Sequence, residues 1–147
     1  MKGKTILGAI VAASSAILLI LLLTLSRACA AETVILKAGP DIRGARGEAV
    51  ILDVGGGPKE VVITAQDLKP NEVYTVWLVN MEPKMAMAGL GTGDYAFTSD
   101  ARGKGTYTAT ISGADLDKWR FIEVAHHPDR DPMNMKNMGV ALKGELK

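Results

Sequence analysis

The chain has few side chains of the kinds that carry out catalysis. Cys29 is the only cysteine among 147 residues, so no disulfide can form within the chain. Beyond the N-terminal segment there are two serines, Ser99 and Ser112, and neither lies in a G-x-S-x-G turn. The glycines at 55–57 lack the following Gly-Lys-Ser/Thr of a phosphate-binding loop, and no H-E-x-x-H occurs. Because no nucleophile and base stand at a recognisable spacing, we expect a protein that is not an enzyme.

Concentrated positive charge is also missing. The overall net charge is +1, but residues 31–147 hold nine lysines and five arginines against sixteen acidic residues, a net charge of −2. Recognition of nucleic acid requires a basic patch that neutralises phosphates. Nucleic acid is therefore not an expected partner.

The longest apolar run lies at the N-terminus, at residues 5–25, and follows Lys2 and Lys4. A helix of this length, rising about 1.5 Å per residue, crosses a hydrocarbon core about 30 Å thick. The lysines predict a cytoplasmic N-terminus, and "ACA" ending at Ala30 has the small-x-small form that a signal peptidase accepts. Residues 1–30 are thus expected to be an uncleaved transmembrane anchor or a signal peptide cut after Ala30. The domain at 31–147 is exported in both cases: it is held at the cell membrane by the anchor, or secreted if cleaved.

Short β-branched runs separated by Gly, Pro, Asn and Asp follow this segment, and no apolar period of 3.6 residues is sustained. The pattern predicts an all-β fold, an antiparallel β-sandwich of about seven or eight strands. Ser112 or Asp115 caps the one expected helical turn, which precedes Trp119. Four residues are expected in the core: Trp77, Tyr74, Leu78 and Ile122. The predicted strands lie at 33–37, 48–54, 60–66, 73–79, 95–98, 105–112, 119–125 and 139–146.

Sulfur and imidazole side chains are concentrated in two stretches. Both histidines, His126 and His127, begin "HHPDRDPMNMKNM" at 126–138. Apart from the initiator, the methionines form two groups that lie outside the strongly predicted strands. A methionine that fills the core is expected inside such strands. The groups are Met81, Met85 and Met87 in "MEPKMAM", and Met133, Met135 and Met138 in "MNMKNM".

These side chains form a candidate copper site. Thioethers are soft ligands that suit Cu(I), and imidazole also binds copper. On an extended strand His126 and His127 point to opposite sides, so at most one of them joins a given site. One shared site also requires the two methionine groups to converge, because metal–ligand bonds are only about 2–2.5 Å long.

Two other interpretations of the same residues stay open. The methionines can pack the two loops against each other, since methionine is a flexible apolar filler, while Asp, Pro and Asn supply ordinary turn chemistry. Alternatively, the two loops form a contact surface for a protein partner.

The order of several segments resembles the exported C-terminal domain of anti-sigma-K factors. The segments are "GEAVILDV", "VVITAQDLKPNEVYTVWLVN", "MAGLG", "FTSDARGKGTYTATI" and "FIEVAHHPDRDPMNMKNMGVAL", and together they cover about residues 47–145. The matching positions are Gly47, Ala49, Tyr74, Trp77, Leu78, Ala88, Gly89, Leu90, Asp100 and Gly103. These are core and turn residues, so the resemblance implies an immunoglobulin-like β-sandwich without catalytic activity. It gives no support to the metal site, because the family loop usually lacks this His and Met set.

One departure from that family affects function. Anti-sigma factors carry a cytoplasmic sigma-binding domain before the membrane helix, whereas about four residues precede the apolar run here. We therefore do not expect this chain to sequester a sigma factor by itself. The expected function is a membrane-anchored or secreted binding or sensing module of the cell envelope; the alternatives are soft-metal (copper) binding and docking to an envelope protein.

Overall fold

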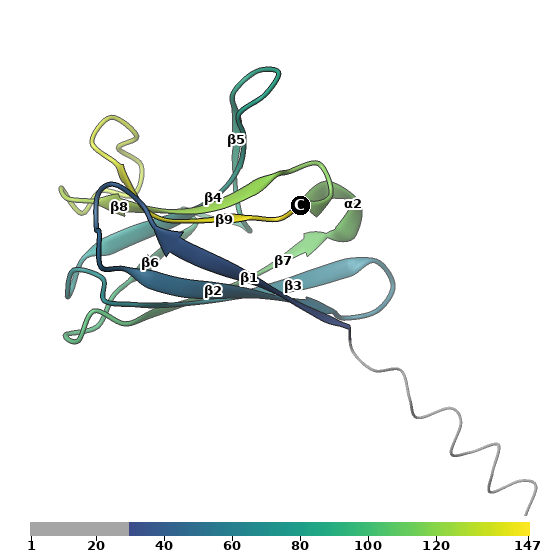
Figure 1. The fold of residues 1–147 in the computed structure, drawn as a ribbon, viewed down its shortest axis with the longest axis horizontal. Helices are drawn as coiled ribbons and strands as arrows, with labels where there is room; N and C mark the ends of the chain where they lie inside the picture. The colour runs from purple at the N-terminus through teal and green to yellow at the C-terminus, as the bar shows by residue number, and fades with distance from the viewer. Residues whose placement is uncertain (1–29) are drawn as a thin grey trace, which may run out of the picture.

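Residues 30–147 of the computed structural model are described here, and they fold into nine strands and one helical turn (Figure 1). The elements are β1 Ala31–Ala38, β2 Arg46–Asp53, β3 Pro58–Gln66, β4 Val73–Asn80, β5 Ala86–Gly89, β6 Ala96–Thr98, β7 Gly105–Ser112, α2 Gly113–Leu116, β8 Phe121–His127 and β9 Gly139–Glu145. The expectation of an all-β fold is confirmed for these residues. The expected anchor or signal segment lies outside the described residues, apart from its last position. Among residues 30–147 no helix is long and apolar enough to cross a membrane.

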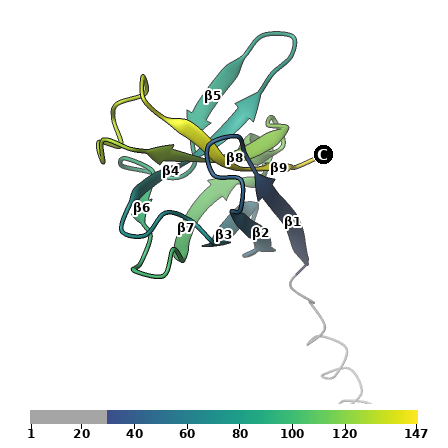
Figure 2. The same ribbon diagram turned by 60° about the vertical axis from the view of Figure 1, so that its left-hand side comes forward.

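The strands form an antiparallel sheet that curls on itself, in the order β5-β4-β8-β9-β1-β2-β3-β7, with β6 also paired to β4. β1 connects the two halves of the sheet: residues 31–36 pair with β2, and Lys37 and Ala38 pair with β9. Figures 1 and 2 show β4, β8 and β9 on one side of the molecule and β2, β3 and β7 on the other. Buried residues from both sides meet in one core cluster.

The alternation of side chains along the strands accounts for this core. In β7, Ala109 is buried and Tyr107 and Ile111 are half-buried, while the three threonines are exposed, as the sequence predicted. Ser112 caps the helical turn by accepting a hydrogen bond from the backbone N–H of Asp115, which confirms the single turn expected there.

Two sequence expectations need correction. β5 was not predicted, because "AMAG" has little β-branched character; it forms by pairing with β4. Trp77 was expected in the core, but it is half-buried on the other face of β4, where its ring meets Tyr95 edge-on. Both faces of β4 are apolar, so the pattern alone could not tell which face holds the core. Tyr74, Leu78 and Ile122 are in the core as expected.

Several loops meet at one end of the sheet and position side chains around the two histidines at the end of β8. The Leu68 N–H donates to the carbonyl of Gly103, and Ser99 Oγ donates to the carbonyl of Lys69 at 2.6 Å. Gly103 has φ +73°, and a Cβ there would lie 2.2 Å from the Leu68 carbonyl oxygen, so only glycine fits this approach. The loop before β4 is thereby fixed against the turn before β7.

Substitutions of Leu36 and Ile35, which are neighbours in β1, test whether the two halves of the curled sheet share one core. Leu36 is 1% exposed and Ile35 is 60% exposed. We expect Leu36→Ala to lower the free energy of unfolding by about 2–5 kcal/mol, because it leaves a cavity between the two halves. The matched variant Ile35→Ala should change it by less than about 0.5 kcal/mol. Urea denaturation followed by tryptophan fluorescence measures both, and equal effects would contradict this packing.

Candidate functional site

The end of β8 carries both histidines, and they point to opposite faces of the sheet. β8 continues through His127, so the alternation expected from the sequence is confirmed. His126 stacks at a tilt on the core residue Tyr74, whereas His127 bonds to Thr75, the next residue on β4. His126 is 1% exposed and His127 is fully buried. The two imidazoles therefore occupy separate environments.

His126 lies between two carboxyl groups that come from different loops. Its Nδ1 is 2.7 Å from Asp41 Oδ2, and its Nε2 is 3.7 Å from Glu72 Oε2. A carboxylate only accepts hydrogen bonds, so the contact with Asp41 places the ring proton on Nδ1. The other ring nitrogen, Nε2, faces Glu72.

The fold holds both carboxyl groups in place. The Asp41 N–H donates to the carbonyl of Val140, which ties the loop after β1 to β9. Gly139 is paired with His126, and a Cβ on it would lie 2.8 Å from Asp41 Cγ, so the glycine leaves room for Asp41. The backbone N–H of Glu72 donates to Ser99 Oγ at 3.0 Å.

Tyr74 packs against the ring of His126 in the cluster that His126 forms with Asp41 and Glu72. Its ring centroid is 5.2 Å from that of His126, and its hydroxyl accepts a hydrogen bond from the backbone N–H of Lys69. Burial is the main reason why the pKa of Tyr74 is raised to about 12; the hydrogen bond from Lys69 opposes this shift, and the nearby charges of Glu72 and Asp41 add to it. The phenol therefore stays neutral near pH 7.

His127 belongs to a buried polar chain on the other face of β8. Trp77 Nε1 donates to Thr75 Oγ1 at 2.7 Å, and Thr75 Oγ1 is 2.8 Å from His127 Nε2. Because Thr75 Oγ1 already accepts from Trp77, its own proton can be donated to His127 Nε2. Burial lowers the pKa of His127, and the charge of Asp129 and the backbone of Asn134 and Asp131 oppose this shift more weakly. The side chain of His127 thus links the end of β8 to β4.

The loop at 128–138 is stabilised by its own aspartates and asparagines. The Asp131 N–H donates to Asp129 Oδ1, the Met133 N–H to Asp131 Oδ1, and the Lys136 N–H to Asn134 Oδ1. The bond from Asp131 is the main reason why the pKa of Asp129 lies below its ordinary value. Turn formation therefore accounts for the polar composition of the loop without a metal.

The methionines lie on two projections rather than in the core. The exposed ones are Met81 (49%), Met85 (60%), Met133 (71%) and Met135 (42%). Met87 lies in β5, and both Met87 and Met138 are half-buried. Figures 1 and 2 show the β4–β5 hairpin and the yellow loop before β9 as two separate projections on the same side of the β4–β8–β9 half.

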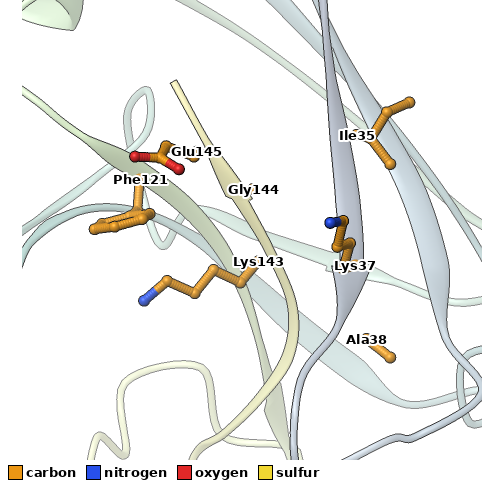
Figure 3. A pocket seen from close by; sticks show the side chains of 7 residues that line it. All are labelled: Ile35, Lys37, Ala38, Phe121, Lys143, Gly144 and Glu145. Carbon is orange, nitrogen blue, oxygen red and sulfur yellow. The ribbon is translucent and has the colours of Figure 1, made fainter. Parts of the chain in front are cut away.

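An open hollow of about 450 Å³ lies over β1 and β9, lined by side chains that include Ile35, Lys37, Phe121 and Lys143 (Figure 3). Lys143 Nζ is 2.8 Å from Glu123 Oε1 and 4.2 Å from the centre of the Phe121 ring. The charge of Lys143 is thus largely balanced. The lining residues include no serine, threonine, cysteine or histidine.

Within the described part of the chain, no three or more His, Cys, Asp or Glu side chains gather in a group that could hold a metal ion. Comparison with protein-family models and with curated proteins found no match for this chain. The resemblance to anti-sigma-K factors, the copper site and the absence of catalysis therefore stay predictions.

Sequence reasoning missed the partners of both histidines. Asp41 and His126 are 85 positions apart, and Thr75 and His127 are 52 apart. Only the pairing of β4 with β8, which sets Tyr74 opposite His126, brings Glu72 and Thr75 to the histidines. No local motif indicates that pairing.

The buried polar chain makes a direct prediction. Thr75→Val keeps the shape of the side chain but leaves Trp77 Nε1 and His127 Nε2 without their shared partner, so we expect a loss of about 1–3 kcal/mol in the free energy of unfolding. Thr75→Ser keeps the hydroxyl and should lose clearly less. Chemical denaturation of the two variants measures the difference, and an equal loss would contradict the role of the hydroxyl.

Proposed function

We propose that this chain is an exported, non-catalytic binding module of the cell envelope. In this proposal an N-terminal helix anchors it in the membrane, or is cleaved after Ala30, and the curled sheet is an immunoglobulin-like β-sandwich. Support comes from the apolar run at 5–25, from the single core between the two sides of the sheet, and from the resemblance to the exported domain of anti-sigma-K factors.

The exposure of the methionines favours a contact surface over the packing of two loops against each other. A methionine that fills space between two loops is covered by its neighbours, but four of these side chains are 42–71% exposed. Exposed, flexible apolar side chains gathered on loops are typical of surfaces that bind partners. We therefore assign the binding surface to the β4–β5 hairpin and the loop at 128–138, with an apolar patch on an envelope protein as the partner.

Export can be tested with the lone cysteine removed. In a Cys29→Ser background, Thr108→Cys places a thiol on an exposed position of β7. We expect a membrane-impermeant maleimide to label it in intact cells, because residues 31–147 face outward. Labelling only after cell lysis would contradict export.

The contact surface can be tested by photo-crosslinking in intact cells of the native host. A photoreactive amino acid at Met85 and at Met133 should give the same crosslinked partner, since both positions belong to one surface. The same amino acid at Thr108, which is exposed on β7, serves as the control. No adduct, or an equal adduct from Thr108, would contradict the assignment.

Copper binding is the second candidate, and the same exposure favours it, because the thioethers are accessible to a Cu(I) ion. The site would use sulfur from Met133, Met135 and their neighbours, since His126 is occupied on the core side of β8.

Titration of the Cys29→Ser chain with Cu(I) against a competing chelator tests this candidate. The paired change of Met133 and Met135 to leucine should weaken binding at least about tenfold, because it removes soft ligands and keeps the apolar volume. Leucine at Met81 and Met85 shows whether the hairpin contributes. Affinity unchanged by all four substitutions would rule out a thioether site.

A further inference from the structure

Two buried polar atoms face each other without a hydrogen-bond partner. Within the described residues, His126 Nε2 and Glu72 Oε2 are both buried and unbonded. Buried polar atoms of this kind are destabilising unless something pairs them. The 3.7 Å between them is well beyond the roughly 2.9–3.0 Å of an N–H···O hydrogen bond. A direct hydrogen bond therefore does not satisfy either atom.

The same distance suits two donor atoms on one metal ion. Metal bonds from imidazole nitrogen and carboxylate oxygen are about 2.0–2.2 Å long, so a tetrahedral ion holds its donor atoms roughly 3.4 Å apart. The observed 3.7 Å needs only a slightly wider angle or a small movement of Glu72. The ion would take the lone pair of His126 Nε2, which Asp41 leaves free.

The hydrogen bond between His126 and Asp41 is of the kind that orients a metal-binding histidine. Such histidines almost always donate their other ring N–H to a carboxylate or carbonyl, which fixes the tautomer and the orientation of the ring. Here Nδ1 lies 2.7 Å from Asp41 Oδ2, in the space that Gly139 leaves open.

We propose that His126 and Glu72 bind one divalent ion of borderline softness, such as Zn²⁺, and that Asp41 is a positioning residue. The Glu72 side chain is 29% exposed although its Oε2 is buried, so in this proposal the water that completes the coordination enters from the Glu72 side. The proposed site has two protein ligands, so it is compatible with the finding that no three or more His, Cys, Asp or Glu side chains gather around a possible metal position in the described part of the chain. Its nitrogen and oxygen donors also distinguish it from the thioethers of the proposed binding surface.

The test is a Zn²⁺ titration of the full chain in detergent, carrying Cys29→Ser and no histidine tag, against a chromophoric chelator. We expect one ion per chain and a loss of affinity of at least tenfold in Glu72→Gln and in His126→Gln. Asp41→Asn should lose about 10–100-fold, because it acts through the orientation of the ring. In ¹⁵N NMR spectra of the imidazoles, Zn²⁺ should shift His126 Nε2 and leave the His127 nitrogens nearly unchanged.

Glu123→Gln is the matched control, because Glu123 lies on the opposite face of β8, paired with Lys143, and should keep full affinity. Glu72→Gln changes a side chain that reaches the surface, so its circular dichroism spectrum should match that of the parent even if His126→Gln unfolds. No Zn²⁺ binding by the parent chain, or binding that survives Glu72→Gln in a folded protein, would overturn the site. Unchanged affinity in Asp41→Asn would overturn the positioning role.

Discussion

The pairing of β8 with β4 gives two adjacent histidines two unrelated surroundings. Residues 121–127 of β8 pair along nearly the whole of β4, and both strands are covered on both faces. Side chains alternate along a strand, so His126 must enter the core side and His127 the other side. Neither imidazole then remains on the surface, and each must find its polar partner inside the protein.

The loops at this end of the sheet supply those partners. Asp41 and Glu72 reach His126 from the loops before β2 and β4, and Thr75 on β4 itself reaches His127. The exposed methionines stand apart from this buried chemistry, on two projections. The two imidazoles are thus buried, whereas four of the thioethers are exposed. These two sets favour different metals and different partners.

The sequence predicted most of the fold because its signals were local. The alternation in β7, the Ser112 cap and the turn-rich breaks each depend on a few neighbouring residues. β5 escaped prediction because pairing with β4, rather than its own residues, makes it a strand. Trp77 was misplaced because both faces of β4 are apolar and only the completed curl decides which face holds the core.

The candidate site could be predicted only in part. The alternation correctly separated the two histidines, and the turn residues explained the loop that follows them. The partners of His126 are distant in sequence, with Asp41 85 positions away, so its contacts have no local signature. Proximity in sequence had instead grouped His126 with Met133 and Met135, which are highly exposed while His126 is buried.

Nuclear Overhauser contacts of the His126 ring protons test this account most directly. The account predicts contacts with the ring protons of Tyr74, whose ring centroid is 5.2 Å away, and none with the ε-methyl groups of Met133 or Met135. Contacts with those methyl groups, without contacts to Tyr74, would show that His126 belongs to the methionine loop and would contradict the buried cluster.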